Sequence, residues 1–317
     1  MGNIKSLLDM QKKFGDNFYN EKNMSDEEKQ EMLKTICLSM HNDVSSLANS
    51  TNFKYYSSKI KTDETKLLYS TIDVFRYILA TWNLFEISPE EINNAFIYRD
   101  IQLNESYKEI EYSKTNCKKV VVVDIDDVLC EFRKCFNQWL RDTYNVNISD
   151  NSKSYYSSVE VKEAGYSPEI VFHDFIKQNK LVDILPIHNM INFVNSLYEK
   201  GYYVQLLTSR PSENHRCHTQ TYVWLKNNNV KYHSLAFSPE KYLWLSQQDY
   251  YINNKVLFAI DDSGKHAIEY ASHGIVCIMP DLSYNKNARH DNIFTFDRYN
   301  EKSVNEIFNC LILKDCQ

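Results

Sequence analysis

The sequence of 317 residues predicts an α/β protein with a doubly wound parallel sheet and a helical cap, preceded by a separate all-α domain. Three observations support this prediction. Four consecutive valines, Val120 to Val123, have the apolar, β-branched character of a strand buried on both faces of a parallel sheet. Further short apolar runs alternate with helical patterns after this strand, as in doubly wound sheets. Residues from about 25 to 105 contain helical patterns only.

Composition and charge limit the classes of function. The chain is 43% hydrophobic and 25% charged, as a globular protein is, and its net charge is −6. This acidic balance disfavours nucleic acid and anionic membranes as partners. No apolar run approaches the ~20 residues that span a bilayer. The eight cysteines contain no CxxC pair and the first residues lack a signal peptide's apolar region, so we expect free thiols and a cytoplasmic location.

The N-terminal helices have recognisable start signals. Ser25 with Glu28 forms a capping box for a helix that ends near residue 48, and a second helical period covers residues 62–84. The run Ser88-Pro89-Glu90-Glu91 starts a third helix with proline at its first position. These patterns predict a helical domain at 1–105, a polar linker at 106–118 and a second domain at 119–317.

The helical domain resembles the all-α nucleoside triphosphate pyrophosphohydrolases, the MazG-like and dimeric dUTPase group. Four runs carry the resemblance: residues 40–47, 53–56, 70–74 and 87–91. It implies an Mg²⁺ site made of ExxE on one helix and ExxD on the next, because i and i+3 share a helix face. Those positions read Asp43 with Ser46 and Ser70 with Asp73. With two carboxylates replaced, we predict a degenerate domain kept for helix packing or for homodimerisation, with residual nucleotide binding as the alternative.

Strands and helices alternate through the second domain. The valine run is followed by helical spacing at 130–144 and at 167–178, within an insertion of about 131–185 that ends at Leu185-Pro186. The remaining strands are predicted at 202–207, 232–237, 256–260, 275–278 and 293–296, and further helices at 188–200, at 219–227 and from Ser238 onward.

Polar residues follow three of these strands. They are Asp124, Asp126 and Asp127 after the valine run, Thr208, Ser209 and Arg210 after the next strand, and Asp261 and Asp262 after the strand at 256–260. Ligands of parallel sheets bind at the carboxyl ends of strands, so we expect these groups to meet. Carboxylate oxygens are the ligands that Mg²⁺ prefers.

This set of motifs resembles the haloacid dehalogenase superfamily of phosphohydrolases. The resemblance implies that Asp124 is a nucleophile that forms an aspartyl-phosphate and that Asp126 is the general acid and base. It gives Thr208 a phosphate-binding role and Lys241, with Lys255 as the alternative, the role of clamping nucleophile and phosphate. Ser209 and Arg210 are expected at the substrate, and anchoring of the loop is the alternative role of Arg210. The implied Mg²⁺ ligands are Asp124, the main-chain carbonyl of Asp126, Asp261 and Asp262.

The insertion at 131–185 resembles the superfamily's helical cap, which favours small phosphate esters. Asp124 and its spacing to Phe132 look most like the 5′(3′)-deoxyribonucleotidases, where an aromatic residue at the position of Phe132 stacks on the base. Phe136, Trp139, Tyr155 and Tyr156 extend this aromatic set, for which core packing is the alternative. The cluster at 215–218 lacks the second half of a metal site, so we interpret it as the start of a helix.

These interpretations predict an Mg²⁺-dependent phosphomonoesterase that acts on nucleoside monophosphates, especially deoxyribonucleotides. A polynucleotide 3′-phosphatase is the alternative enzyme, and a non-catalytic nucleotide-binding or scaffold protein is the alternative class. The expected partners are a small-molecule nucleotide and a second copy of the chain bound through the helical domain.

Overall fold

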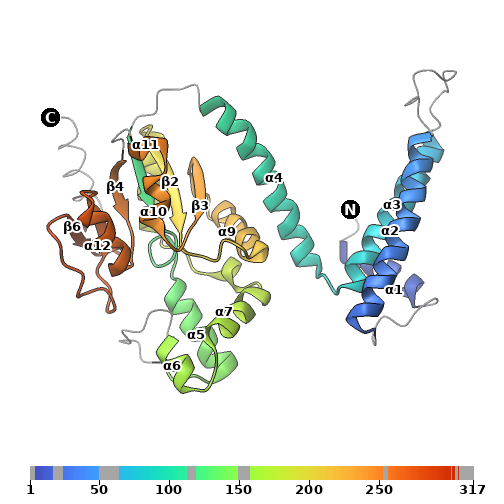
Figure 1. Cartoon of the computed structure of the whole chain (residues 1–317), viewed down its shortest axis with the longest axis horizontal. Helices are drawn as coiled ribbons and strands as arrows, with labels where there is room; N and C mark the ends of the chain where they lie inside the picture. The colour runs from blue at the N-terminus through green and yellow to red at the C-terminus, as the bar shows by residue number, and fades with distance from the viewer. Residues whose placement is uncertain are drawn as a thin grey trace. The chain divides into compact units, whose positions relative to one another are not determined.

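The computed structural model of the chain describes residues 4–16, 24–49, 64–112, 119–148, 158–252 and 256–300, with 302, 303 and 306. The chain divides into two compact units, residues 1–93 and 94–317, and each is described by itself. Figure 1 shows the helices and strands of both units. Among the described helices, none has the length and apolar character needed to cross a membrane.

The first unit is helical, as predicted. It contains α1 (Ile4–Gly15), α2 (Asp26–Asn49), α3 (Glu64–Leu84) and the start of α4 (Pro89–Tyr112). The capping box at α2 is confirmed, because Ser25 N donates to Glu28 Oε2 at 2.7 Å and Glu28 N donates to Ser25 Oγ at 3.3 Å. Helix α1 was not predicted, since its first turn carries no acidic residue.

The boundary between the units differs from the predicted linker at 106–118. Helix α4 continues through the first part of that range, and the division lies before Asn94. Inside the second unit, Asn94 Nδ2 donates to Asn179 Oδ1 at 3.2 Å, and the ring of Tyr98 lies 5.1 Å from that of Tyr222. These tertiary contacts place most of α4 in the second unit, and local sequence carries no signal for them.

The second unit is built on a six-stranded parallel sheet. All six strands fall where the sequence predicts them: β1 (Val120–Val123), β2 (Tyr203–Thr208), β3 (Ser234–Phe237), β4 (Val256–Ile260), β5 (Cys277–Pro280) and β6 (Ile293–Phe296). Their order is β3-β2-β1-β4-β5-β6, and every pairing is parallel. The chain therefore switches direction between β1 and β4, which opens a crevice at the carboxyl ends of these two strands.

Helices cover both faces of this sheet. The side chains of Val121 and Val123 belong to the apolar core shared with α8 (His188–Glu199) and α9 (His215–Asn227). Val120 and Val122 belong to a second core, shared with α10 (Lys241–Ser246) and α12 (Gly264–Ser272). Because successive strand residues alternate between faces, the valine run contributes to both cores, and the doubly wound prediction is confirmed.

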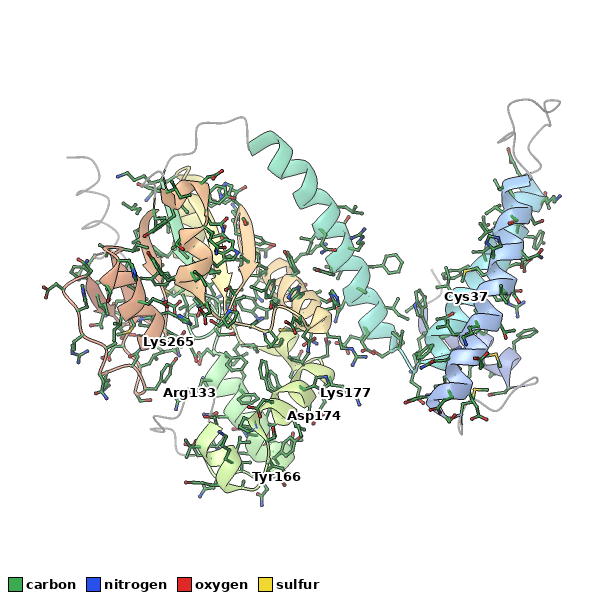
Figure 2. The ribbon with its side chains drawn as sticks, in the orientation of Figure 1. Cys37, Arg133, Tyr166, Asp174, Lys177 and Lys265 are labelled. Atoms are coloured by element: carbon green, nitrogen blue, oxygen red, sulfur yellow. The ribbon has the colours of Figure 1, made fainter. Side chains whose placement is uncertain are left out.

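The predicted insertion forms a helical cap. It consists of α5 (Phe132–Tyr144), α6 (Ser158–Glu163), α7 (Pro168–Lys177) and the 3₁₀ helix η3 (Lys180–Asp183), and Figure 1 shows α5, α6 and α7 grouped beyond one end of the sheet. Its two ends lie side by side, since Glu131 N donates to Leu185 O and Ile187 N donates to Leu129 O, both at 2.8 Å. Figure 2 labels Tyr166, Asp174 and Lys177 within the cap. Tyr155 and Tyr156 lie outside the described residues.

Candidate active site

Three acidic residues converge at the switch point of the sheet. Asp124 follows β1, and Asp261 and Asp262 follow the neighbouring strand β4. The main chain joins the two strand ends, because Asp124 N donates to Ile260 O at 2.9 Å. Carboxylate oxygens of the three acids lie within 4.8 Å of one another. Over the part of the chain that the structure describes, no other group of three or more His, Cys, Asp or Glu side chains is placed to share a metal ion.

A buried lysine pairs with two of these acids. Lys241 Nζ lies 2.8 Å from Asp124 Oδ1 and 2.7 Å from Asp261 Oδ2, and its side chain is 1% exposed. Lys241 begins α10, whose position beside α12 brings it to the strand ends. The structure thus brings this lysine to the acids, as the sequence predicts. Lys255, the alternative, lies outside the described residues.

The charges of this group do not balance. Burial raises the pKa of Asp124 to about 6 against the opposing effect of Lys241, and burial with the neighbouring acids raises the pKa of Asp262 well above its ordinary value. Burial alone lowers the pKa of Lys241, but Asp124 and Asp261 raise it overall. The group therefore contains three buried carboxyl groups and one ammonium, which contacts two of them, an arrangement that an additional cation would stabilise.

A divalent cation fits this donor set. Asp262 Oδ1 is buried and has no hydrogen-bond partner among the described residues. A buried carboxylate oxygen lowers the stability of the folded protein unless a hydrogen-bond donor or a cation binds to it. Hard oxygen ligands with surplus negative charge suit Mg²⁺. Asp124, Asp261 and Asp262 are the side chains that would hold it.

Asp126 is engaged by an arginine rather than by the acids. Arg210 Nε donates to Asp126 Oδ2 at 3.0 Å and Arg210 Nη2 donates to Asp126 Oδ1 at 2.6 Å, a bidentate ion pair. Arg210 Nη1 donates to Thr221 Oγ1 at 2.8 Å, and Arg210 is 2% exposed. The guanidinium therefore anchors the loop that carries Asp126, and a contact of Arg210 with substrate stays a prediction. No sequence motif marks Thr221 as its partner.

Two hydroxyl residues lie where β2 ends. Thr208 is fully buried and its Oγ1 accepts a hydrogen bond from Arg210 N at 3.3 Å. Ser209 is partly exposed, and its Oγ lies 3.2 Å from His266 Nε2. Burial and the charge of Lys241 lower the pKa of His266 to about 4, so the imidazole is neutral near pH 7. Sequence analysis missed His266, which follows the paired acids on α12 without a motif of its own.

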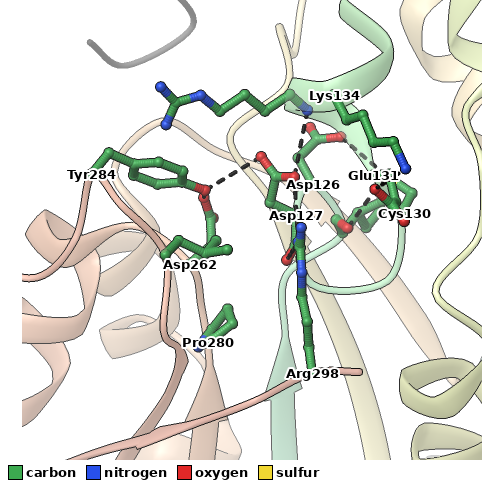
Figure 3. Close-up of polar contacts among 12 residues, drawn as sticks. Asp126, Asp127, Cys130, Glu131, Lys134, Asp262, Pro280, Tyr284 and Arg298 are labelled. Atoms are coloured by element: carbon green, nitrogen blue, oxygen red, sulfur yellow. Dashed lines mark hydrogen bonds and ion pairs between the residues drawn. The ribbon is translucent and has the colours of Figure 1, made fainter. Parts of the chain in front are cut away.

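Asp127 connects the loop after β1 to two later loops (Figure 3). Its φ is 54°, in the left-handed region, and this residue replaces the glycine usual in the resembling family. Arg298 Nη1 donates to the main-chain oxygen of Asp127 and, at 3.3 Å, to its Oδ1. The Tyr284 hydroxyl donates to Asp127 Oδ2 at 3.3 Å and also contacts Asp262 Oδ2. Sequence analysis missed both partners, which lie after β5 and β6.

The aromatic prediction is wrong for Phe132. Its side chain is 1% exposed and its ring stacks on Phe136 at 5.4 Å, with Phe175 against its edge, because α5 packs its apolar face on α7. A pocket of about 340 Å³ lies instead beside Phe172 of α7, which is partly exposed. The pocket's other lining residues include Phe136, Pro168, Ser209, Arg210 and Pro211. Of the two aromatic rings that line this pocket, that of Phe172 is partly exposed and that of Phe136 is buried.

The cluster at 215–218 begins α9, as interpreted from the sequence. Cys217 is fully buried in the core, and the ring of His218 stacks on Phe237 at 3.8 Å. These side chains contribute to packing rather than to a metal site.

The acidic positions of the helical unit have no comparable surroundings. Asp73 on α3 is exposed and Asp43 on α2 is partly exposed, and neither belongs to a metal-capable group in the described part of the chain. The run at 53–56, which carries part of the family resemblance, lies outside the described residues.

Comparison with known protein families identifies the family of this chain. The family model of dUTPase matches residues 3–183, more than half of the sequence, and the chain belongs to this family. The match includes the helical unit and extends beyond the range of 30–105 on which the sequence resemblance rests. Comparison with curated proteins gave no match.

Solved structures similar to the chain are distant from it. A haloacid dehalogenase-like hydrolase from Streptococcus pneumoniae is 13% identical with a TM-score of 0.43, covering 60% of this chain and 98% of its own. The HAD-hydrolase YfnB from Bacillus subtilis, solved bound to magnesium, is 13% identical with a TM-score of 0.42, covering 62% of this chain and 99% of its own.

Proposed function

We propose that the second unit is an Mg²⁺-dependent phosphomonoesterase and that its substrates are nucleoside monophosphates, deoxyribonucleotides in particular. One observation carries this proposal. Asp124, a buried carboxylate at the switch point of the sheet, is held at 2.8 Å by Lys241 beside two further acids that share a potential cation site. Phosphoryl transfer requires a positioned nucleophile and neutralisation of the phosphoryl charge, and this arrangement supplies both.

The chemistry consists of two displacements at phosphorus. A carboxylate oxygen of Asp124 attacks, the ester P–O bond breaks, and the leaving alkoxide takes a proton from Asp126. Water then attacks the aspartyl-phosphate and gives a proton to Asp126, so that inorganic phosphate leaves and Asp124 is restored. Lys241 balances charge on the nucleophile and the phosphoryl oxygens. A cation held by Asp124, Asp261 and Asp262 would neutralise further phosphoryl charge.

The proton role of Asp126 requires a change of partner. Both of its oxygens accept hydrogen bonds from Arg210 in the structure, so both are engaged by the guanidinium rather than directed to a leaving group. We therefore propose that a substrate draws Asp126 away from Arg210 before the leaving group is protonated.

The pocket beside Phe172 supports a nucleoside as the leaving group. Its volume of about 340 Å³ lies at the lower end of ligand pockets, and Ser209, which directly follows the last residue of β2, lines it. A base stacked on the Phe172 ring would place its sugar phosphate toward the strand ends. The cap would limit access to small esters.

The family match adds hydrolysis of dUTP as a second candidate. Two of the four carboxylates that the resemblance leads us to expect are Ser46 and Ser70, which weakens any cation site there. We propose that the helical unit serves packing and homodimerisation and that turnover belongs to the second unit.

The test is phosphate release from ribo- and deoxyribonucleoside mono- and triphosphates, dUTP included, and from a 3′-phosphorylated oligonucleotide, with and without Mg²⁺. Selective Mg²⁺-dependent release from a monophosphate, lost in Asp124→Asn, is the expected result. Release from the oligonucleotide alone would replace the proposal with a polynucleotide 3′-phosphatase. Pyrophosphate from dUTP that persists in Asp124→Asn would assign activity to the helical unit. Absence of phosphate release from every compound tested would favour a non-catalytic binding protein over an enzyme.

A further inference from the structure

The hydroxyl of Tyr284 lies between two acids of different loops. It donates to Asp127 Oδ2 at 3.3 Å and makes a shorter contact with Asp262 Oδ2. Figure 3 shows the ring of Tyr284 directed toward these two carboxylates. A phenol has a single hydrogen, and the shorter contact identifies Asp262 as its principal acceptor.

Tyr284 is held in place by a contact on its ring and by hydrogen bonds of the next residue. The Arg133 guanidinium lies over its ring, 4.5 Å from the centroid. Asn285, the next residue, donates from Nδ2 to the main-chain oxygens of Asp262 and Pro280, both at 2.8 Å. The loop after β5 is therefore fastened to the residue whose carboxylate Tyr284 contacts.

The two oxygens of Asp262 consequently differ. Oδ2 is occupied by the Tyr284 hydroxyl, whereas Oδ1 is buried and has no hydrogen-bond partner among the described residues. Asp262 belongs, with Asp124 and Asp261, to the group whose oxygens lie within 4.8 Å of one another. A rotation of the carboxylate about its last torsion would exchange its two oxygens, and a fixed donor on one of them opposes that rotation.

We propose that Tyr284 is a positioning residue that fixes which oxygen of Asp262 faces the divalent cation. Through its second contact, Tyr284 also links this metal ligand to Asp127. The inference rests on the proposed function, because it requires that the three acids bind a cation. Removal of outer hydrogen bonds of this kind typically lowers metal affinity about 10- to 100-fold.

The test measures Mn²⁺ binding to the full chain by electron paramagnetic resonance, and Mg²⁺ by competition. Tyr284→Phe should weaken binding about 10- to 100-fold. Tyr144→Phe is the matched control, because the Tyr144 hydroxyl also donates to a carboxylate, Asp174 Oδ2 at 3.0 Å, but in the cap. Its affinity should equal that of the wild type. Circular dichroism of each metal-free variant verifies folding.

The outcomes separate this inference from the proposed function. If the wild type binds and Asp262→Asn does not, but Tyr284→Phe binds as the wild type does, the role of Tyr284 is refuted and the cation site stands. If the wild type itself binds no cation, both the role of Tyr284 and the proposed function fail.

Activity gives a second readout: in Tyr284→Phe the Mg²⁺ concentration for half-activation should rise about 10- to 100-fold. The kcat at saturating Mg²⁺ should stay near that of the wild type. A lowered kcat with unchanged Mg²⁺ dependence would also contradict the proposal.

Discussion

Acidic residues occupy motif positions in both units, but their surroundings differ. In the helical unit Asp73 is exposed and Asp43 is partly exposed, and serines replace the carboxylates expected three residues away. In the second unit Asp124, Asp261 and Asp262 are each at most 5% exposed. Exposed carboxylates have little effect on the free energy of folding, because water solvates them. Buried carboxylates lower stability unless a cation or hydrogen bonds compensate their lost solvation. A buried acidic group with an incomplete set of partners therefore indicates a working site more strongly than a motif does.

The largest expected effect tests this contrast directly. Asp124→Asn should lower kcat for the substrate by at least about 10³-fold, because the amide is a poor nucleophile, while the fold persists. Asp43→Asn in the helical unit is the matched change and should leave kcat unaltered. Steady-state phosphate release measures both, and equal loss in the two variants would abolish the distinction between the units.

The second largest effect is expected when the buried ammonium group of Lys241 is removed. Lys241→Met leaves Asp124 and Asp261 buried without their ammonium, and we expect unfolding free energy to fall by about 3–5 kcal/mol. Lys231→Met is the control, because Lys231 pairs with Glu199 at 2.6 Å with both side chains largely exposed. That loss should be about 0–1 kcal/mol. Urea denaturation in the absence of metal gives both values, and similar losses would show that the buried pair has no special weight.

The pKa of Asp124 gives a pH-dependent prediction for the metal-free protein. Burial raises this pKa from 3.8 to about 6, so between these values the folded state binds more protons than the unfolded state, and its stability falls as the pH rises. Asp124→Asn removes this contribution. The difference in unfolding free energy should move in favour of the variant from about pH 4 to pH 6, by at most about 3 kcal/mol. A difference that is independent of pH would show that Asp124 titrates normally.

Substitutions of Phe172 and Phe132 should have different effects, the first mainly on substrate binding and the second on stability. Phe172→Ala should raise the KM for the nucleotide about fivefold, because a lost stacking contact is worth about 1 kcal/mol. It should lower stability less than Phe132→Ala does, because the Phe172 ring is partly exposed although it contacts Phe132 and Phe136. Phe132→Ala should lower stability by about 3–5 kcal/mol, because its ring is buried in the core. Thermal unfolding and KM measured together test both, and a KM effect at Phe132 alone would restore the original base-stacking assignment.

Sequence patterns predicted the parts of this molecule that local chemistry determines. The strands are short apolar runs, and the acids that follow β1 and β4, Asp124, Asp261 and Asp262, converge as expected because the carboxyl ends of parallel strands share one edge. Lys241 was recognised from its helix start. Phe132 was misassigned because helical spacing does not distinguish a ring that faces a ligand from one that faces the core.

The supporting shell of the site was not predictable from sequence. Tyr284 and Arg298 reach Asp127 from loops, and His266 reaches Ser209 from α12. None of the three belongs to a motif, and their proximity depends on how β5, β6 and α12 pack. Arg210 was noticed, but its pairing with Asp126 depends on Thr221 in α9. The extension of α4 into the second unit likewise arises from tertiary contacts.

The central claim is that Asp124 becomes phosphorylated during turnover. Acid quenching of the full chain during turnover, followed by peptide mass spectrometry, measures this directly. The account predicts one phosphoryl group on the peptide that contains Asp124, and none when Mg²⁺ is removed or in Asp124→Asn. Turnover with no phosphorylated peptide, or with the phosphoryl group on another residue, would contradict the assignment of Asp124 as nucleophile.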